Sequence, residues 1–293
     1  MKLVKPEFQI IEPTGYTIDD IYKSIELAGR VSHKSEDKIT ETSAKDFVGR
    51  MLNMKHLATC EFGTIYLTER WRGTCLLSKY QGNPYTIINE KNFNGETWRF
   101  ITTNYRTLIE NNWLDDLKYL CEPTEYHHKR YTVKFICDRA IANEIVRHRK
   151  FSFLQESTRY CNYSKGKFNG ELTFIQPIWT YHQEDGDYGT LGNPKRKNVG
   201  NKDGVFFDFI KSLQYAEHYY LTLVKQGWKA EEARNVLPLS LKTELYMCGF
   251  TEDWKNFFKL RSKKYGVGNP HPQADELATP LYEEFIKRGY INE

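Results

Sequence analysis

The side chains best suited to chemistry are concentrated between residues 147 and 164, in the stretch RHRKFSFLQESTRYCNYS. The stretch opens with Arg147, His148 and Arg149, and a further cation, Arg159, follows an apolar run. Guanidinium groups bind phosphate bidentately and stay charged, so the pattern indicates an anion site. The alternative is that cations at a helix C-terminus favour the helix dipole. That explanation covers two of these charges but not Arg159.

Two arginines from distant segments strengthen the anion-site interpretation. In TEDWKNFFKLRS, Arg261 follows Trp254 by seven residues and therefore lies on the apolar face of the expected helix. Arg234, in AEEARNVLPL, lies similarly along one face of its segment. We expect these inward-leaning arginines to meet one buried anionic ligand, with Gln155, Ser157 and Thr158 as orienting polar contacts. A core arginine paired with a carboxylate is the alternative for Arg261.

Composition limits the class of protein. The chain has 293 residues, of which 40% are hydrophobic, and we expect a single domain over residues 1–293. The formal net charge of +4 does not require a nucleic-acid partner. The chain contains no run of about 18 apolar residues, so we expect no membrane span. The first residues, MKLVKPEFQIIEP, lack the apolar stretch and cleavage site of a signal peptide.

The cysteines and glycines exclude several familiar sites. None of the 6 cysteines has CxxC spacing, which predicts reduced thiols of a cytoplasmic protein and no metal site. GVGNPH and GDYGTLG contain glycines, but neither follows a strand and opens a helix with GxGxxG spacing. The chain therefore carries no Rossmann or P-loop signal.

The spacing of apolar residues, together with the capping and turn residues between them, predicts an α+β fold with a central mixed or antiparallel sheet flanked by helices. Helices are expected to begin with the capping pattern Thr17–Asp20, at Ser43 and at Asp138. Further helices are expected at about 205–226, 230–247 (bent at Pro238), 251–264 and 272–288. Strands are expected at 61–68, 130–137 and 171–178. Residues 69–130, with two short helical runs near 104–121, are interpreted as an ordered insertion, and 181–204 as a mobile surface loop.

Several motifs resemble those of a known family. Arg147-His148-Arg149 followed after seven residues by Ser157 resembles the RHR-x7-S signature of the flavin-dependent thymidylate synthases, the ThyX family. The order of further motifs agrees. GRVSHKS at 29–35 resembles the ARxS segment, His56-x4-Glu61 the histidine-to-glutamate motif, RNVLPL at 234–239 the R-x-V-L-P segment, and NFFKLR at 256–261 the C-terminal arginine motif.

The resemblance implies a reaction and its partners. FAD would be the non-covalent prosthetic group, NADPH the reductant, methylenetetrahydrofolate the carbon donor and dUMP the acceptor that becomes dTMP. A homotetramer with sites shared between subunits is also implied. Arg261 would be the catalytic residue, because a cation against the uracil carbonyl and N3 stabilises developing charge. Ser157 is interpreted as a nucleotide contact and not as a nucleophile.

By family position, the resemblance also assigns two sets of ligand-binding residues. The set that would line dUMP is Glu144, Arg147, Gln155, Ser157, Thr158, Arg159, Arg234 and Arg261. The set that would contact FAD is His56, Ala58, Arg147, His148, Arg149, Gln155 and Asn256.

Departures from the family pattern and two rival functions stay open at this point. Phe250 and Glu252 stand where many members place Asn and Arg against FAD, Ala58 stands where a hydroxyl is common, and Leu154 replaces a frequent polar residue. One rival is a nucleic-acid-binding module that uses RHRK and the tyrosines, with affinity that falls steeply with salt. The other is a flavoprotein that oxidises NADPH without methylating dUMP.

Overall fold

The computed structural model describes residues 1–70, 76–180, 185–193 and 204–292. Its main sheet has four strands in the order β2-β6-β10-β7, and two three-stranded sheets have the orders β8-β1-β9 and β3-β5-β4. The strands are β1 Lys2–Val4, β2 Glu7–Ile11, β3 Thr64–Arg70, β4 Ile87–Phe93, β5 Glu96–Asn104, β6 Arg130–Asp138, β7 Ser152–Gln155, β8 Thr173–Ile175, β9 Gly186–Asp187 and β10 Lys242–Phe250.

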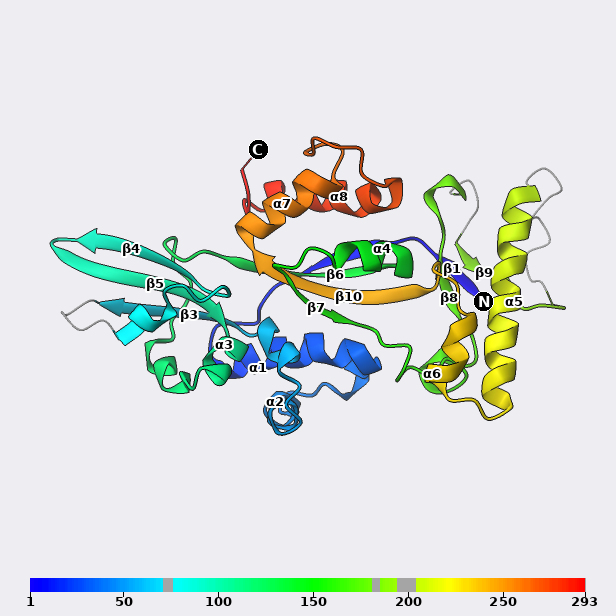
Figure 1. Ribbon diagram of the computed structural model, residues 1–293, viewed down its shortest axis with the longest axis horizontal. Helices are drawn as coiled ribbons and strands as arrows, with labels where there is room; N and C mark the ends of the chain where they lie inside the picture. The colour runs from blue at the N-terminus through cyan, green and yellow to red at the C-terminus, as the bar shows by residue number, and fades with distance from the viewer. Residues whose placement is uncertain (71–75, 181–184, 194–203, 293) are drawn as a thin grey trace.

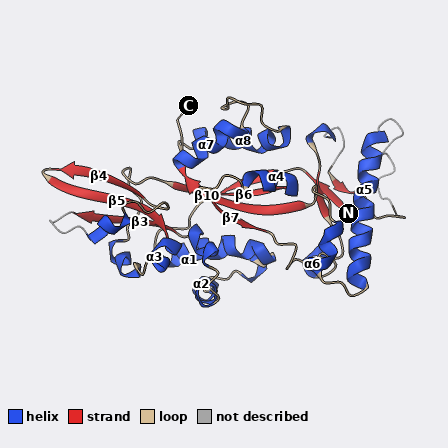
Figure 2. Cartoon of the chain, in the orientation of Figure 1, coloured by secondary structure: helices blue, strands red, loops and turns tan. Residues whose placement is uncertain are grey.

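Helices cover both faces of the main sheet (Figures 1 and 2). Helices α4, α7 and α8 lie on one face, α1 and α2 lie on the other, and α5 with α6 closes one end. The bounds are α1 Ile18–Gly29, α2 Ser43–Asn53, α3 Tyr105–Glu110, α4 Arg139–Ile145, α5 Gly204–Lys225, α6 Ala230–Ala233, α7 Thr251–Arg261 and α8 Pro272–Lys287. The α+β architecture with a central antiparallel sheet agrees with the sequence-based expectation.

Strand β10 corrects the expected helix at 230–247. Only α6 and the 3-10 turn η8 (Arg234–Val236) are helical there, and the chain after Pro238 enters the centre of the main sheet. Leu245 and Met247 pack in the core beneath α4, α7 and α8, whereas Tyr246 and Cys248 pack against α1. A strand buried on both faces has an almost continuous apolar sequence, and its periodicity does not distinguish it from a buried helix.

The structure confirms the predicted helix starts at Thr17 and Asp138, where capping residues mark them. Thr17 and Asp20 form the reciprocal capping box of α1. Asp138 accepts a hydrogen bond from the backbone N–H of Ile141 at 2.7 Å and so begins α4. In α7, Trp254, Phe257 and Phe258 are buried as the stripe predicted.

Within residues 69–130, the β4–β5 hairpin was not anticipated. Its turn contains Asn94 and Gly95, both with positive φ (54° and 83°), the conformation that an Asn-Gly hairpin turn requires. Strand β5 pairs with β3 over 64–70, so this segment builds a separate sheet. The two short helical runs expected near 104–121 are present as α3 and the 3-10 helix Leu114–Tyr119.

Other expectations are tested only in part. The segment 181–204 lies mostly outside the described residues, but Gly186 and Asp187 pair with β1 as β9. The strand expected at 171–178 is limited to β8, and the one expected at 61–68 starts at Thr64 after the 3-10 helix η3 (Leu57–Phe62). The described cysteines are free thiols, and Cys75 lies outside the described residues. In the described part of the chain, no helix is long and apolar enough to cross a bilayer.

Candidate active site

Helix α4 delivers the basic triplet to the surface. Its buried residues Ile141 and Ile145 hold it on the sheet, and it ends at Ile145, with the C-cap Val146 directly before the triplet. Arg147 and Arg149 are exposed, and neither makes an ion pair with a described residue. Two permanent cations without carboxylate partners are therefore available for an anionic ligand.

Arg261, at the end of α7, reaches the C-terminal turn of α4. Its Nη1 donates to Glu144 Oε2 at 2.5 Å, its Nη2 to the Glu144 backbone oxygen at 3.3 Å, and its Nε to His148 Nε2 at 3.1 Å. The side chain is 18% exposed. The ion pair with a carboxylate, which the sequence analysis gave as the alternative for Arg261, is thus present. The carboxylate belongs to Glu144, which is itself predicted to bind dUMP.

His148 is held as a neutral imidazole in this arrangement. Burial, followed by the neighbouring charge of Arg261, lowers its pKa to about 4. The ring packs edge-on against Phe257, with centroids 5.1 Å apart. The neutral ring accepts a hydrogen bond from the Arg261 Nε–H, so Glu144 and His148 orient the guanidinium from two sides.

Residues of α7 and of the segment after α4 surround a hollow of about 420 Å³. Its lining includes the basic triplet, Asn256 and Arg261, with Asp253 at one side. Burial raises the pKa of Asp253. A basic hollow with one amide side chain can hold a phosphorylated ligand and orient a planar group beside it. We call this set, Glu144, Arg147, His148, Arg149, Asn256 and Arg261, the helix-end group.

A second set of predicted residues lies elsewhere, and we call it the loop group: Ser157, Thr158, Arg159 and Arg234. Arg234 Nη1 donates to Thr158 Oγ1 at 3.3 Å, and Arg159 Nε to Glu231 Oε2 at 3.4 Å. The inward-leaning orientation expected for Arg159 and Arg234 is wrong in the single chain, where both are exposed. The reason for Arg234 is local: it begins a 3-10 turn, and the long helix whose apolar face it would share does not form.

The main sheet separates the two groups. Glu144 and Arg261 lie on the face that α4 and α7 cover. The Ser157 backbone N–H donates to Ser32 of the 3-10 turn η1 (Arg30–His33), on the α1 side of the sheet, at 3.1 Å. One chain therefore does not bring all the predicted dUMP-binding residues to one place.

The remaining predicted residues flank β7. Gln155 ends this strand, and its Nε2 donates to Thr243 Oγ1 at 3.2 Å. His56 and Ala58 are exposed at the start of η3, on the α1 side, apart from the helix-end group. Glu61 of the histidine-to-glutamate motif pairs with Arg106 at 2.6 Å. The FAD-binding set is therefore also divided around the β7 edge.

Two of the four departures from the family pattern, Phe250 and Glu252, contact other residues of the chain. The Phe250 ring lies 5.6 Å from the Arg130 guanidinium carbon, so an arginine of β6 covers this position. Glu252 is exposed and pairs with Lys255 at 2.8 Å. Both residues thus have partners within the chain.

A buried charge cluster that was not predicted from the sequence lies beside the turn that carries Ser157, Thr158 and Arg159. Lys34, Lys134 and Lys242 each contact the Glu244 carboxylate at 2.6–2.7 Å. Burial opposes ionisation of Glu244, but the charge of Lys242 and hydrogen bonds from the lysines outweigh it and lower its pKa far below the ordinary value. The only sequence signal was charge inside the apolar strand LKTELYM.

Glu156 connects this cluster to the loop. It is 2% exposed, accepts from Tyr163 Oη at 2.8 Å, and lies 3.5 Å from Lys242 Nζ. Its backbone N–H donates to the Glu244 carbonyl at 2.9 Å. The turn that carries Ser157 and Arg159 is therefore anchored at its first residue.

Comparisons with known proteins agree with the motifs. A family model described as thymidylate synthase complementing protein matches residues 92–288, which is more than half of the chain. The chain belongs to this family, and the family predicted from RHR-x7-S is confirmed. The match includes residues 92–130 of the segment interpreted as an insertion, and that interpretation stays a prediction. The motifs at 29–35 and 56–61 precede the match.

Curated relatives carry consistent names. A probable flavin-dependent thymidylate synthase of Paramecium bursaria Chlorella virus 1 is 28% identical over 158 residues, 53% of this chain and 66% of the relative. The flavin-dependent thymidylate synthase of Synechocystis sp. is 27% identical over 142 residues, 44% of this chain and 55% of the relative. The chain thus spans about half to two thirds of the length of these relatives. A UMP/dUMP methylase, PolB from Streptomyces cacaoi, aligns over 98% of this chain and 92% of its own, with a TM-score of 0.45 and 16% identity.

Proposed function

We propose that the protein is a flavin-dependent thymidylate synthase, which converts dUMP to dTMP with methylenetetrahydrofolate as carbon donor and NADPH as reductant through bound FAD. The observation that carries the proposal is the basic triplet held beside Arg261 by Glu144, in a chain with the complete RHR-x7-S motif. Membership of the family and the names of the curated relatives support it.

The helix-end group fits the anionic part of a flavin dinucleotide. Arg147 and Arg149 are exposed cations without described carboxylate partners, and Asn256 offers an amide in the same hollow. They would hold the cofactor together with His148, and His56, Ala58 and Gln155 would complete the contacts around the β7 edge. When bound, FAD supplies the hydride-transfer chemistry that side chains lack.

Arg261 would act on the uracil ring. Its guanidinium is permanently charged and oriented by Glu144 and His148, so it can stabilise negative charge that develops at the uracil carbonyl and N3. The phosphate of dUMP would bind Arg159 and Arg234, with hydroxyl contacts from the adjacent residues Ser157 and Thr158.

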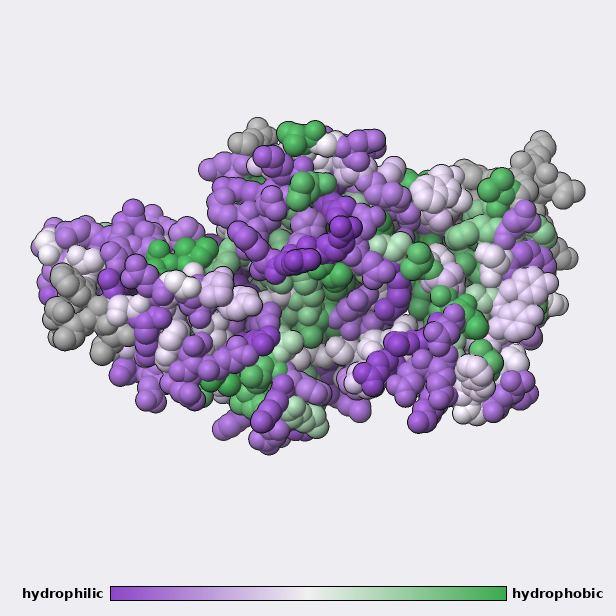
Figure 3. Space-filling view, viewed as in Figure 1, coloured by the Kyte–Doolittle hydropathy of each residue, from purple (hydrophilic) through white to green (hydrophobic). Residues whose placement is uncertain are grey.

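A second copy of the chain would complete each site. The two groups lie on opposite sides of one sheet, so a nucleotide that contacts both must use different subunits, and we propose the homotetramer that the resemblance implies. Strand β7 is an edge strand, and a strip of apolar side chains lies over it between the hydrophilic layers of α7 and α1 (Figure 3). An uncovered edge with an apolar strip is a suitable surface for a partner subunit.

Spectroscopy and product analysis test the proposed reaction. The purified protein should be yellow, with a flavin absorption band, and should form dTMP from dUMP, methylenetetrahydrofolate and NADPH under anaerobic conditions. A flavin-loaded tetramer that oxidises NADPH but makes no dTMP would instead be the rival flavoprotein. A colourless protein whose nucleic-acid affinity falls steeply with salt would be the binding module.

The described free thiols support a cytoplasmic location for the enzyme.

Subunit mixing tests the shared site. Arg261→Ala and Arg234→Ala should each abolish activity alone, because each removes a cation from a different group. Co-expression of the two variants should restore part of the activity, since some sites in mixed tetramers contain neither substitution. Mixed assemblies that stay inactive although native mass spectrometry shows both chains would contradict the shared site.

A further inference from the structure

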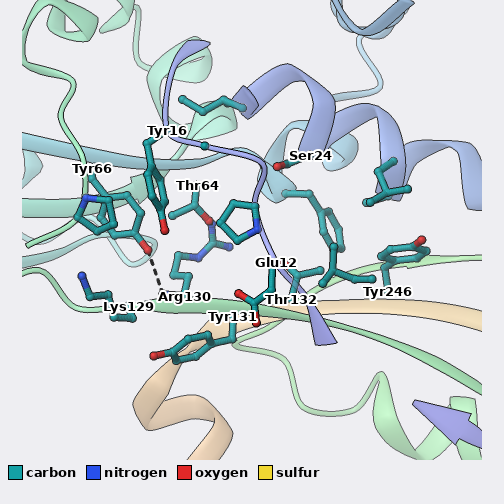
Figure 4. A pocket seen from close by; sticks show the side chains of 18 of the residues that line it. Glu12, Tyr16, Ser24, Thr64, Tyr66, Lys129, Arg130, Tyr131, Thr132 and Tyr246 are labelled. Carbon is teal, nitrogen blue, oxygen red and sulfur yellow. Dashed lines mark hydrogen bonds between the residues drawn. The ribbon is translucent and has the colours of Figure 1, made fainter. Parts of the chain in front are cut away.

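A pocket of about 250 Å³ lies apart from both groups of site residues, beside β2 (Figure 4). Strand β2 is the edge of the main sheet opposite β7. Ser24 of α1 lies on one side of the pocket, Thr132 of β6 on another, and Tyr66 of β3 at the end near the 69–130 segment. None of the residues assigned to dUMP or FAD is among the described residues that line it.

Aromatic rings make up much of the wall. Tyr16 comes from the loop between β2 and α1, and Tyr66, Tyr131 and Tyr246 come from β3, β6 and β10; together they surround the space (Figure 4). Tyr16 and Tyr66 meet edge to face, with centroids 5.7 Å apart. Such a wall offers ring faces and edges to a planar ligand, while the phenol groups supply hydrogen bonds.

Two cations line the pocket, and each contacts only neutral acceptors. Lys129 Nζ donates to the Thr124 carbonyl at 2.6 Å. Arg130 Nη1 donates to the Glu61 carbonyl and to Thr64 Oγ1, both at 3.1 Å. Neither cation forms an ion pair with a carboxylate in the described part of the chain. Partial burial lowers the pKa of Lys129, as expected for an ammonium that has no carboxylate partner among the described residues.

The carboxylate of the lining is already occupied. Glu12 accepts hydrogen bonds from Arg288 at 2.6 Å and from the Tyr290 hydroxyl. Positive charge is therefore in excess at the described walls of the pocket, and a bound anion would satisfy cations that now have no charged partner.

We propose that this pocket binds a small planar aromatic molecule with one acidic group, its ring between the tyrosines and its acid toward Lys129. The volume of 250 Å³ is slightly below the lower end, about 300 Å³, of sites for drug-sized ligands, which suits a molecule of one or two rings. The site is separate from the chemistry proposed above and does not depend on it.

Binding of 2-naphthoate, compared with its neutral analogue 2-naphthylmethanol, tests the proposal. Fluorescence titration of the wild-type protein should show the acid binding about tenfold more tightly, the effect of one charge-assisted hydrogen bond. Lys129→Gln should remove most of this preference and leave binding of the alcohol unchanged. Lys91→Gln, an exposed lysine of the same segment, is the matched control and should behave like the wild type.

A variant that fills the pocket tests whether the probe binds there. Ser24→Leu should abolish binding of both molecules, whereas Ser24→Ala, which leaves the space open, should retain it. Equal affinity of acid and alcohol in the wild type, or binding of the acid that survives Ser24→Leu, would overturn the proposal. Displacement of the probe by dUMP together with insensitivity to Ser24→Leu would place it at the anion site instead. Because the readout needs neither flavin nor dTMP, its failure is distinguishable from failure of the proposed enzyme activity.

Discussion

Arg261 and Glu144 join α7 to α4 through two separate contacts. The guanidinium donates to the Glu144 carboxylate at 2.5 Å and to its backbone carbonyl at 3.3 Å. The second contact reaches a carbonyl in the last turn of α4 that also accepts from the Arg147 backbone N–H at 3.4 Å. The orientation of the proposed catalytic cation is therefore coupled to the end of the helix that presents the basic triplet.

The first prediction concerns the shape of this cation. Arg261→Lys keeps the charge but loses the planar fork that contacts Glu144 and His148 together. dTMP formation should fall by roughly two to three powers of ten, the effect of removing one preorganised donor. Reduction of bound flavin by NADPH should change much less, because that step does not involve uracil. Stopped-flow absorbance and product assays on one preparation measure both.

A structural role for Arg261 makes a different prediction. If the pair with Glu144 only holds α7 against α4, the lysine variant should lose thermal stability, and both half-reactions should decline together. Arg50→Lys, at an exposed position on α2, is a matched control and should change neither rate.

The second prediction is a pH dependence from His148. Its pKa is about 4 in the folded protein and near 6.5 when unfolded, so between these values the unfolded chain binds the proton and the folded chain does not. The stabilising contribution is complete above pH 6.5 and is lost as the pH falls toward 4. We expect about 1–2 kcal/mol, since partial exposure screens the effect.

Denaturation by urea between pH 4 and 8 tests it. His148→Gln should flatten this part of the profile, whereas His218→Gln, at an exposed position on α5, should leave it unchanged. His33 and His127 also have lowered pKa values because of burial, so the difference between variant and wild type isolates His148. Identical profiles for both variants would show that His148 is not held neutral.

The third prediction concerns the loop group. Arg159→Ala should weaken dUMP binding by about 2–4 kcal/mol, because it removes a charged partner of the phosphate, while flavin content stays largely the same. Calorimetry and flavin absorbance provide the two readouts. Loss of FAD with unchanged dUMP affinity would reassign Arg159 to the cofactor.

The fourth prediction concerns the buried charge cluster. Glu244→Gln leaves three lysines around an uncharged amide, and the free energy of unfolding should fall by about 3 kcal/mol. Glu252→Gln, which breaks an exposed pair with Lys255, should change it by less than about 1 kcal/mol. Urea denaturation at pH 7 compares them. Equal effects would mean that Glu244 is not the centre of the cluster.

Local signals in the sequence predicted the parts of the fold that depend on neighbouring residues. The Thr17–Asp20 capping box, Asp138 and the stripe around Trp254 each define a helix through contacts within a few residues. The Asn94–Gly95 pair is also a local signal, for the turn of the β4–β5 hairpin, although no hairpin was predicted there. Strand β10 had no comparable signal, because its pattern depends on helices packed against both of its faces.

The site was predictable as residue types but not as an arrangement. The anion-binding character of Arg147, Arg159 and Arg261 followed from their chemistry and motif spacing. Their division between two sides of the sheet did not, since it depends on pairing of β10 with both β6 and β7. The partnership of Arg261 with Glu144 spans 117 positions and leaves no local trace in the sequence.

Strand β10 also restricts how the length of this chain can vary among relatives. It spans nine residues between the turn that carries Arg234 and the helix that carries Arg261. Gain or loss of one residue there would exchange the two faces of the strand, move Glu244 toward the apolar layer under α4 and turn α7 away from Glu144. The tip of the β4–β5 hairpin is under no such restriction. Insertions and deletions should therefore accumulate in the hairpin during divergence, while β10 keeps its length.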